Sequence, residues 1–428
     1  MKVRPPVFLI LVLLYTPVLW GQSSKKVSVA ITNVTLHVGN GKVIEKGFIG
    51  IKDGKIQEVG TPPSTENYEQ TINGQGQHVY PGLIAPNSRL GLEEVEAVRS
   101  TLDFREVGKN NPSLRSIVAY NTDSQIIPTV RSNGILMVQV VPEGGRIAGQ
   151  SSVAYTEAFN WEDAALQLDN CIHLYWPNRF HYTGWWGRPS PTKGNKKYAE
   201  QLAIISVYLD AAKAYHGKAE VEQKNLKFEA MNGLFDKKKK LFVHIDDARS
   251  IIEAVELLEP YGIELVIVGG AETWMITDFI KEKNLPVVLS NIHRLPRQVD
   301  EDIDQPFKTP ALLQEAGILF AFSMQGSWNI RNLPFQAGQA VGYGLDAEAA
   351  VAAMTSNTAK ILGIDQRVGT LEKGKDATII ISKGDVMDMR TSVVTDAYIE
   401  GRRVNLDDKQ KALYRKYTDK YGLETIGN

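Results

Sequence analysis

The hydrophobic period of the chain changes twice, and these changes divide it into regions of different structure. Residues 27–36 alternate apolar and polar side chains, which is the pattern of a half-buried β-strand. Asn40-Gly41 and Asp53-Gly54 are hairpin-turn dipeptides, and Phe48–Ile51 between them predicts another strand. The same texture returns at Ala377–Ser382, Thr395–Ile399 and Arg402–Val404. We therefore predict one small β-sandwich domain built from both chain ends, residues 27–79 and 368–405.

The middle of the chain alternates short apolar runs with helical patterns. The runs are Leu241–Ile245, Leu265–Val268, Pro286–Leu289 and Ile318–Phe322. Helical spacing appears at Ala248–Leu258, Glu272–Glu282, Ala311–Ala316, Ala347–Thr355 and Thr358–Leu362. Strands that are apolar on both faces and alternate with helices predict a parallel sheet. About eight such strands fit before Ser323, so we predict an α/β fold with a (β/α)8 TIM barrel over residues 80–367.

The two termini predict export and a helical tail. Basic Lys2 and Arg4 precede the apolar run Val7–Tyr15, which is too short to span a bilayer. We predict a signal peptide over residues 1–22, which ends at Gly21 or Gln22, and a periplasmic or extracellular protein with no stable membrane anchor. Residues 406–428 predict a C-terminal helix and tail. Its face of Leu413, Tyr414, Tyr417 and Tyr421 is expected to dock on the body or on a partner.

Charge and cysteine content exclude several kinds of binding partner and metal site. The chain has 48 Lys plus Arg and 49 Asp plus Glu, so no overall positive field favours nucleic acid, and none is expected as a partner. Cys171 is the single cysteine. This excludes an intramolecular disulfide and any cysteine-rich zinc or iron–sulfur site.

Three segments carry a resemblance to a known family. They are His78–Ile84 (HVYPGLI), Asn357–Gly363 (NTAKILG, with Thr358 where proline is usual) and Val368–Ala377 (VGTLEKGKDA). In order and spacing they resemble the amidohydrolase superfamily, in its imidazolonepropionase-like branch, over nearly the whole chain after the signal peptide. The resemblance implies a metal-dependent-hydrolase-like barrel and the hydrolysis of non-peptide carbon–nitrogen bonds.

The same resemblance implies a set of metal ligands that this chain mostly lacks. The family holds a divalent ion with a His-x-His pair after strand 1, histidines after strands 5 and 6, and an aspartate after strand 8. The metal-bound hydroxide attacks the substrate. Here Asn87 and Arg89 follow strand 1, Glu272 follows strand 6 without a histidine, and Gln325 falls at the aspartate position. His244, after strand 5, is the sole family ligand that remains.

Other residues could line or rebuild a site at the barrel mouth. His293 follows the strand Val287–Ser290, and with His244, Asp246 and Glu272 it could supply the minimum ligands of a catalytic zinc. Arg146 lies in the glycine-rich stretch Gly144–Ser152, which we read as a barrel loop; backbone N–H groups in such a loop could instead cradle an anion.

Arg89 needs partners if it projects into the mouth, because a buried, unpaired guanidinium is costly. We expect Glu272 and Asp246 to pair with it, and Gln325 and Asn87 to complete its hydrogen bonds. Such a cluster would replace the metal as the organising charge of the pocket. The alternative is that Arg89 points into solvent at the rim.

Two functions follow from the sequence. The first is an exported pseudoenzyme that binds a small molecule at the barrel mouth, or acts beside a homologous subunit or a second copy, with no cofactor. The second is an active amidohydrolase that uses an altered metal site around His244, with a divalent ion such as zinc. The missing ligands favour the first function, whereas His244 and the intact scaffold support the second.

Overall fold

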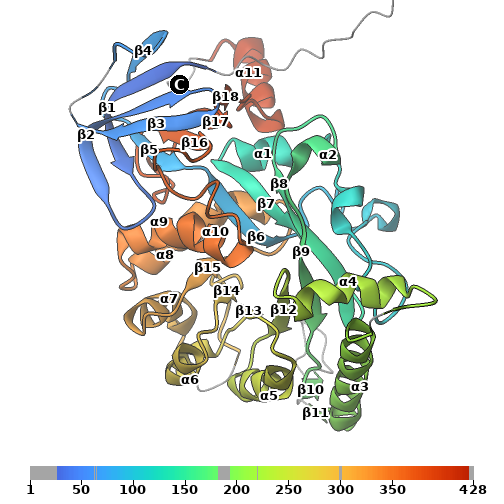
Figure 1. The fold of residues 1–428 in the computed structure, drawn as a ribbon. Coiled ribbons are helices and arrows are strands. Elements are labelled where there is room, and N and C mark those ends of the chain that lie inside the picture. Colours follow the sequence, from blue (N-terminus) through green and yellow to red (C-terminus); the bar gives the residue numbers. More distant parts are fainter. Residues whose placement is uncertain are drawn as a thin grey trace, which may run out of the picture.

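The structure is a computed structural model that describes residues 27–61, 63, 65–181, 193–218, 220–297 and 301–423. The predicted signal peptide therefore lies outside the described residues. A β-rich part is joined to a barrel surrounded by helices (Figure 1). None of the helices in the described ranges is both long and apolar enough to cross a membrane.

The β-rich part is one sheet to which both chain ends contribute. The strand order is β18-β17-β16-β5-β1-β2-β3, with β4 also paired to β1. Their bounds are Val29–His37 (β1), Val43–Lys52 (β2), Lys55–Gly60 (β3), Gln70–Asn73 (β4), His78–Pro81 (β5), Ile379–Ser382 (β16), Val394–Ile399 (β17) and Arg402–Arg403 (β18). Antiparallel pairing of β5 with β16 joins the two chain ends. The predicted β-structure shared by both ends is thus confirmed, while the predicted domain boundaries stay predictions.

The second sheet forms a nearly closed barrel in the order β6-β7-β8-β9-β12-β13-β14-β15. Its strands are Leu83–Ser88 (β6), Ile135–Val140 (β7), Ile147–Tyr155 (β8), Ala165–Tyr175 (β9), Lys240–Ile245 (β12), Leu265–Gly269 (β13), Val287–Leu289 (β14) and Phe320–Phe322 (β15). Most of these strands are buried on both faces, as the unbroken apolar runs predicted. The predicted barrel is confirmed.

One barrel strand differs from the predicted parallel arrangement. β8 runs antiparallel to both β7 and β9, and it occupies most of the stretch that we read as a glycine-rich loop. Only residues 141–146 connect β7 to β8. A parallel crossover needs about a dozen residues or more, so this connection can only reverse the chain. Gly144 and Gly145 form the turn with φ values of 97° and 71°, which favour glycine.

Helices surround much of the barrel, and they alternate with its strands from β9 onward (Figure 1). They are Ile127–Arg131 (α1), Trp161–Ala164 (α2), Tyr198–His216 (α3), Leu226–Phe235 (α4), Ala248–Leu258 (α5), Thr277–Glu282 (α6), Gln305–Glu315 (α7), Leu333–Val341 (α8), Ala347–Met354 (α9) and Ser356–Leu362 (α10). Short 3-10 turns lie at Arg99–Thr101, Ser116–Ala119, Glu259–Tyr261, Thr273–Met275 and Asn329–Asn332, and a small hairpin joins Phe180–His181 (β10) to Lys193–Gly194 (β11).

α5 illustrates why these segments are helical. The side chain of Asp247 caps its first turn by accepting the Ser250 N–H at 2.9 Å. Ile251, Val255 and Leu258 recur at helical spacing and are buried against the barrel. The helix therefore begins directly after β12 and positions the two aspartates of that connection at the barrel mouth.

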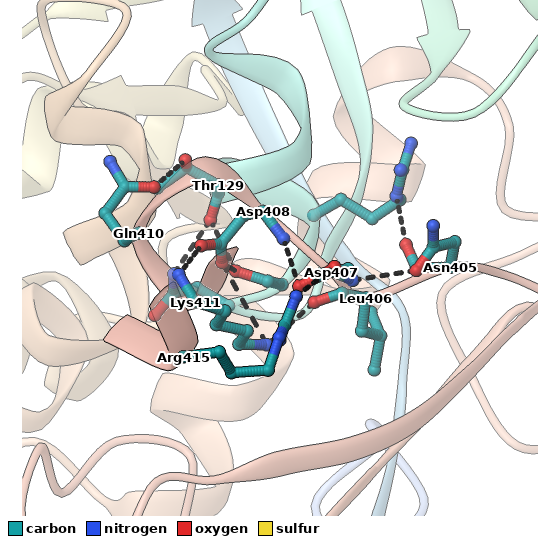
Figure 2. Close-up of polar contacts among 11 residues, drawn as sticks. Thr129, Asn405, Leu406, Asp407, Asp408, Gln410, Lys411 and Arg415 are labelled. Carbon is teal, nitrogen blue, oxygen red and sulfur yellow. Dashed lines mark hydrogen bonds and ion pairs between the residues drawn. The ribbon is translucent and has the colours of Figure 1, made fainter. Parts of the chain in front are cut away.

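The C-terminal helix α11 (Lys409–Tyr421) is held by polar contacts, as Figure 2 shows. The Asp408 carboxylate caps the helix through the Lys411 N–H and accepts the Ser132 hydroxyl at 2.7 Å. Thr129 donates to the Gln410 side chain at 2.8 Å. The predicted face is not buried against the body, because its side chains are 39–63% exposed, and docking on a partner stays a prediction. The side chains are those of Leu413, Tyr414, Tyr417 and Tyr421.

Candidate functional site

The carboxyl ends of the barrel strands surround a main cavity of about 1090 Å³. Its wall includes Asn87 at the end of β6, His244 in β12 and Gln325 after β15. Asp246 and Glu272 also line it. A smaller cavity of about 280 Å³ lies beside it and shares Asn87, Tyr175, His244 and Gln325 with it. The mouth predicted from the barrel fold thus exists as a cavity of the size that small-molecule sites have.

His244 is tied into a buried hydrogen-bond chain inside the barrel. Its Nε2 lies 2.9 Å from Nδ1 of His173, and His173 Nε2 lies 2.8 Å from the Ser151 hydroxyl. Gln139 donates to the same hydroxyl at 3.0 Å, and it accepts the backbone N–H of Asn87. Burial lowers the pKa of His244 to about 3 and that of His173 well below its usual value. Both rings are therefore neutral near pH 7.

Tyr175 shields the other side of this histidine pair. Its ring stacks on His244 with a centroid distance of 4.0 Å, and its hydroxyl donates to the Pro142 carbonyl. Tyr175 and His244 are register partners on the adjacent strands β9 and β12, so both side chains face the barrel interior. The sequence of strand β9 is too ambiguous to predict the strand, so Tyr175 and His173 were not among the predicted site residues.

Arg89 pairs inside the small cavity, but not with the predicted residues. Its Nε lies 3.3 Å from Glu93 and 3.5 Å from Glu143, and its guanidinium lies 4.7 Å from the Phe104 ring centroid. The expectation that Glu272 and Asp246 would pair with Arg89 is wrong, because the loops after β6 and β7 place nearer carboxylates there. The alternative of a solvent-facing Arg89 is also wrong, since only 23% of its side chain is exposed.

Glu143 is the carboxylate that the sequence reading overlooked in this cavity. It follows the buried strand β7, so inspection of every strand end would have found it. Burial raises the pKa of Glu143, whereas Arg89 and Arg105 act in the opposite direction. The small cavity therefore holds an arginine whose charge is offset by acidic neighbours.

Asp246 and Glu272 have other partners at the main cavity. Asp246 forms an ion pair with Arg297 at 2.6 Å. Glu272 accepts the backbone N–H of Ala248 at 2.9 Å, at the first turn of α5. These carboxylates therefore organise the connections after β12 and β13.

His293 does not join His244. It is exposed, its backbone N–H donates to the Asn291 side chain, and it lines neither cavity. The expectation that His293 lies at the same mouth is wrong, because β14 ends at Leu289 and the following loop carries the ring outward to contact Phe307.

The donor set at the mouth does not fit a divalent metal ion. Among the described residues, no group of three or more His, Cys, Asp or Glu side chains could hold one. The Nε2 of His244 is engaged by His173, and amides stand at Asn87 and Gln325. The uncharged oxygens of these amides are poor ligands for zinc. The described residues of the mouth therefore lack the set of donors that the family resemblance implies for a metal.

A polar cluster missed by the sequence reading forms the outer wall of the main cavity. Arg179 bonds the Glu253 carboxylate at 2.5 Å and the Ser250 hydroxyl at 2.9 Å. Tyr198, from α3, donates to the same carboxylate at 2.5 Å and accepts the Trp176 indole N–H at 3.0 Å. The cluster links the segment after β9 to α3 and α5, and thereby fixes the rim of the cavity.

Arg146 lines a third cavity, of about 390 Å³, next to the main one. It precedes β8, and because β8 is reversed, this strand begins at the mouth instead of ending there. The structure thus brings Asn87, Arg89, His244 and Gln325 together at the small cavity, and places Asp246 and Glu272 at the main cavity and Arg146 beside it.

Comparison with known proteins shows which family model and which solved structures resemble this chain. The model of the amidohydrolase family matches residues 216–404. No curated protein sequence matches the chain. A solved amidohydrolase structure from Thermotoga maritima MSB8 is similar with a TM-score of 0.77 and 24% identity, covering 88% of this chain and 99% of that chain.

Two other solved structures are more distant. A prolidase complexed with N-methylphosphonate-L-proline has a TM-score of 0.53 and 14% identity, with coverage of 88% of this chain and 99% of that chain. An adenosine deaminase from Xanthomonas campestris with bound zinc has a TM-score of 0.53 and 14% identity, with coverage of 92% and 98%. At these identities the likeness concerns the fold.

Proposed function

We propose that the chain is a member of the amidohydrolase superfamily that binds a small molecule at its barrel mouth without a catalytic metal. Family membership supports a hydrolase ancestry, but activity depends on the site and not on the fold. One observation carries the proposal. The single remaining family ligand, His244, is bonded through Nε2 to His173 and faces amides and a paired arginine in the small cavity.

The main cavity supports the binding half of the proposal. Its volume of about 1090 Å³ suits a small organic ligand, and its wall combines aromatic and polar groups. Tyr175 and Trp176 offer ring surface, while Asn87 and Gln325 offer amide groups. A ligand would be positioned by stacking and hydrogen bonds, with the neutral His244 as a further donor or acceptor.

Export remains part of the proposal. The N-terminal segment motivates it, and a buried free cysteine is compatible with it, since Cys171 is 0% exposed and its pKa is raised by burial to about 12. A homologous subunit or a second copy is the proposed macromolecular partner. Fractionation of the producing cells, with and without residues 1–22, tests the export.

Elemental analysis and an activity assay test the central claim together. The purified full-length protein is expected to hold well under one zinc, iron or manganese ion per chain. It is also expected not to hydrolyse dipeptides or cyclic amides with or without added zinc. His244→Ala should leave the metal content unchanged, as should the control His216→Ala on α3. A content of about one ion per chain that is lost in His244→Ala alone would overturn the proposal in favour of an altered metal site.

A further inference from the structure

The third cavity differs from the others in the charges of its wall. This side cavity, of about 390 Å³, lies between the Gly144-Gly145 turn and the end of β9. Lys109 and Arg146 are among its lining residues, and no carboxylate is found among the described ones. Amide side chains are contributed by Asn178, Asn195 and Gln201. The described part of its wall therefore offers two positive charges and no negative one.

The backbone around Arg146 holds its position firmly. The Arg146 N–H donates to the Lys109 carbonyl at 2.6 Å, and its own carbonyl accepts the Tyr175 N–H at 2.8 Å. These bonds tie the start of β8 to both neighbouring segments. Because these backbone bonds already exist without a ligand, binding at Arg146 would not have to order the backbone of this turn, which reduces the entropy lost on binding.

The guanidinium of Arg146 has a weak protein partner. Its Nη1 lies 3.3 Å from the neutral side-chain oxygen of Asn110, and no carboxylate in the described ranges pairs with it. Partial burial lowers the pKa of Arg146, so the charge is removed from water without an opposite charge beside it. An anionic ligand would supply that missing charge.

The amides extend the donor surface. Asn195 donates from Nδ2 to the Asn178 carbonyl and to the side-chain oxygen of Gln201, both at 2.9 Å. This arrangement orients Gln201 so that its oxygen is used within the protein and its NH2 group remains a donor. An oxyanion accepts several hydrogen bonds at once, as a guanidinium and amide N–H groups provide.

The side cavity adjoins the main cavity. They share five lining residues, namely Tyr175, Trp176, Pro177, Asn178 and Asn195. We propose that the side cavity binds the oxyanion group of a small molecule, a carboxylate or a phosphate, while the rest of that molecule occupies the main cavity. The proposal names the ligand class of the proposed function and rests on it.

Anion titrations of the full-length protein test this site. Inorganic phosphate and acetate are titrated separately at constant ionic strength against chloride, with binding followed by calorimetry and by thermal melts. We expect at least one of them to bind the unmodified protein, and the tighter of the two identifies the oxyanion. Arg146→Gln should weaken that binding about tenfold or more, since a charge-assisted hydrogen bond is lost. Arg146→Lys should restore part of it.

Control variants and a second measurement keep the outcomes separate. Arg99→Gln removes the same charge at an exposed position outside the cavities and should leave binding unchanged. If Arg146→Gln does not fold, Lys109→Gln takes its place, with a loss of several-fold expected. Equal binding by the variant and the unmodified protein, or no binding of either anion, overturns the inference. Metal content measured on the same samples decides the proposed function separately.

Discussion

Two neighbouring cavities at the barrel mouth each contain an arginine, and the two arginines are treated differently by the fold. In the small cavity, Arg89 lies 3.3 Å from Glu93 and 3.5 Å from Glu143, and its guanidinium faces Phe104. In the side cavity, Arg146 lies 3.3 Å from the neutral Asn110 oxygen. The first charge is offset by the protein itself, whereas no carboxylate of the described residues offsets the second.

This difference separates a structural role from a binding role. A charge paired within the fold stabilises the local structure when both partners are present. Removing one partner destabilises the protein, because the other charge is then buried without a counter-charge. A cation without a protein counter-charge contributes little to stability and is available to a ligand. We therefore expect stability to depend on Arg89 and anion binding to depend on Arg146.

The largest expected effect comes from Arg89→Met. This change leaves Glu93 without its cation, and the Glu93 side chain is only 7% exposed. We expect a loss of about 2–3 kcal/mol in the free energy of unfolding, seen as a clear fall in the melting temperature. The matched variant Arg146→Met should change it by less than about 1 kcal/mol, because no carboxylate loses a partner. Equal losses in the two variants would erase the distinction between the cavities.

Acidification should have the next largest effect, through the buried histidines that border the small cavity. Burial lowers the pKa of His244 to about 3, whereas an unfolded histidine titrates near 6.5. Between these values the unfolded chain binds more protons, so the contribution to stability is complete above about pH 6.5 and is lost as the pH falls toward 3. A single such histidine loses about 2 kcal/mol between pH 7 and pH 5.

Denaturant unfolding at several pH values measures this loss. His244→Gln should flatten the pH dependence relative to the unmodified protein, because the remaining acidic groups are common to both. His216→Gln, at the end of α3 and outside the buried chain, serves as the control and should not flatten it. A profile of His244→Gln that parallels the unmodified one would show that His244 does not remain neutral in the folded state.

Much of the fold could be predicted because its signals are local. Apolar runs such as Leu241–Ile245 and Leu265–Val268 are strands in the structure, and the segment Val368–Ala377, which carried the resemblance, lies within the residues that the amidohydrolase family model matches. The reversed strand β8 could also have been predicted. The connection of residues 141–146 is too short for a parallel crossover, but the reading of its glycines as a loop masked this constraint.

The partners of the site residues could not be predicted, since they depend on distances between loops. The sequence places Arg89, Glu272 and Asp246 after barrel strands, yet the two carboxylates bond elsewhere and Arg89 pairs with Glu93, four residues along its own loop. The prediction that His293 lies at the mouth was wrong for the same reason: β14 ends at Leu289, and the strand pattern does not determine the direction of the loop that follows. Strand ends identify the mouth, but not the pairs within it.

The smallest expected change in stability, and the sharpest test of the comparison, comes from Glu143→Gln. The ion pair at 3.5 Å is partly exposed, with 34% of the Glu143 side chain accessible, and Glu93 still pairs with Arg89, so we expect a loss of about 1 kcal/mol or less.

The change nevertheless removes half of the negative charge that offsets Arg89. The small cavity should then resemble the side cavity and gain affinity for inorganic phosphate. Because a ligand that binds only the folded state raises its stability, the gain should appear as a phosphate-dependent rise in melting temperature that survives Arg146→Gln in the same chain. In the chain with Glu143 intact, Arg146→Gln should abolish most of the phosphate effect. If Glu143→Gln adds no phosphate response, charge balance alone does not decide which arginine is available to a ligand, and the shape of the cavity must be the controlling property.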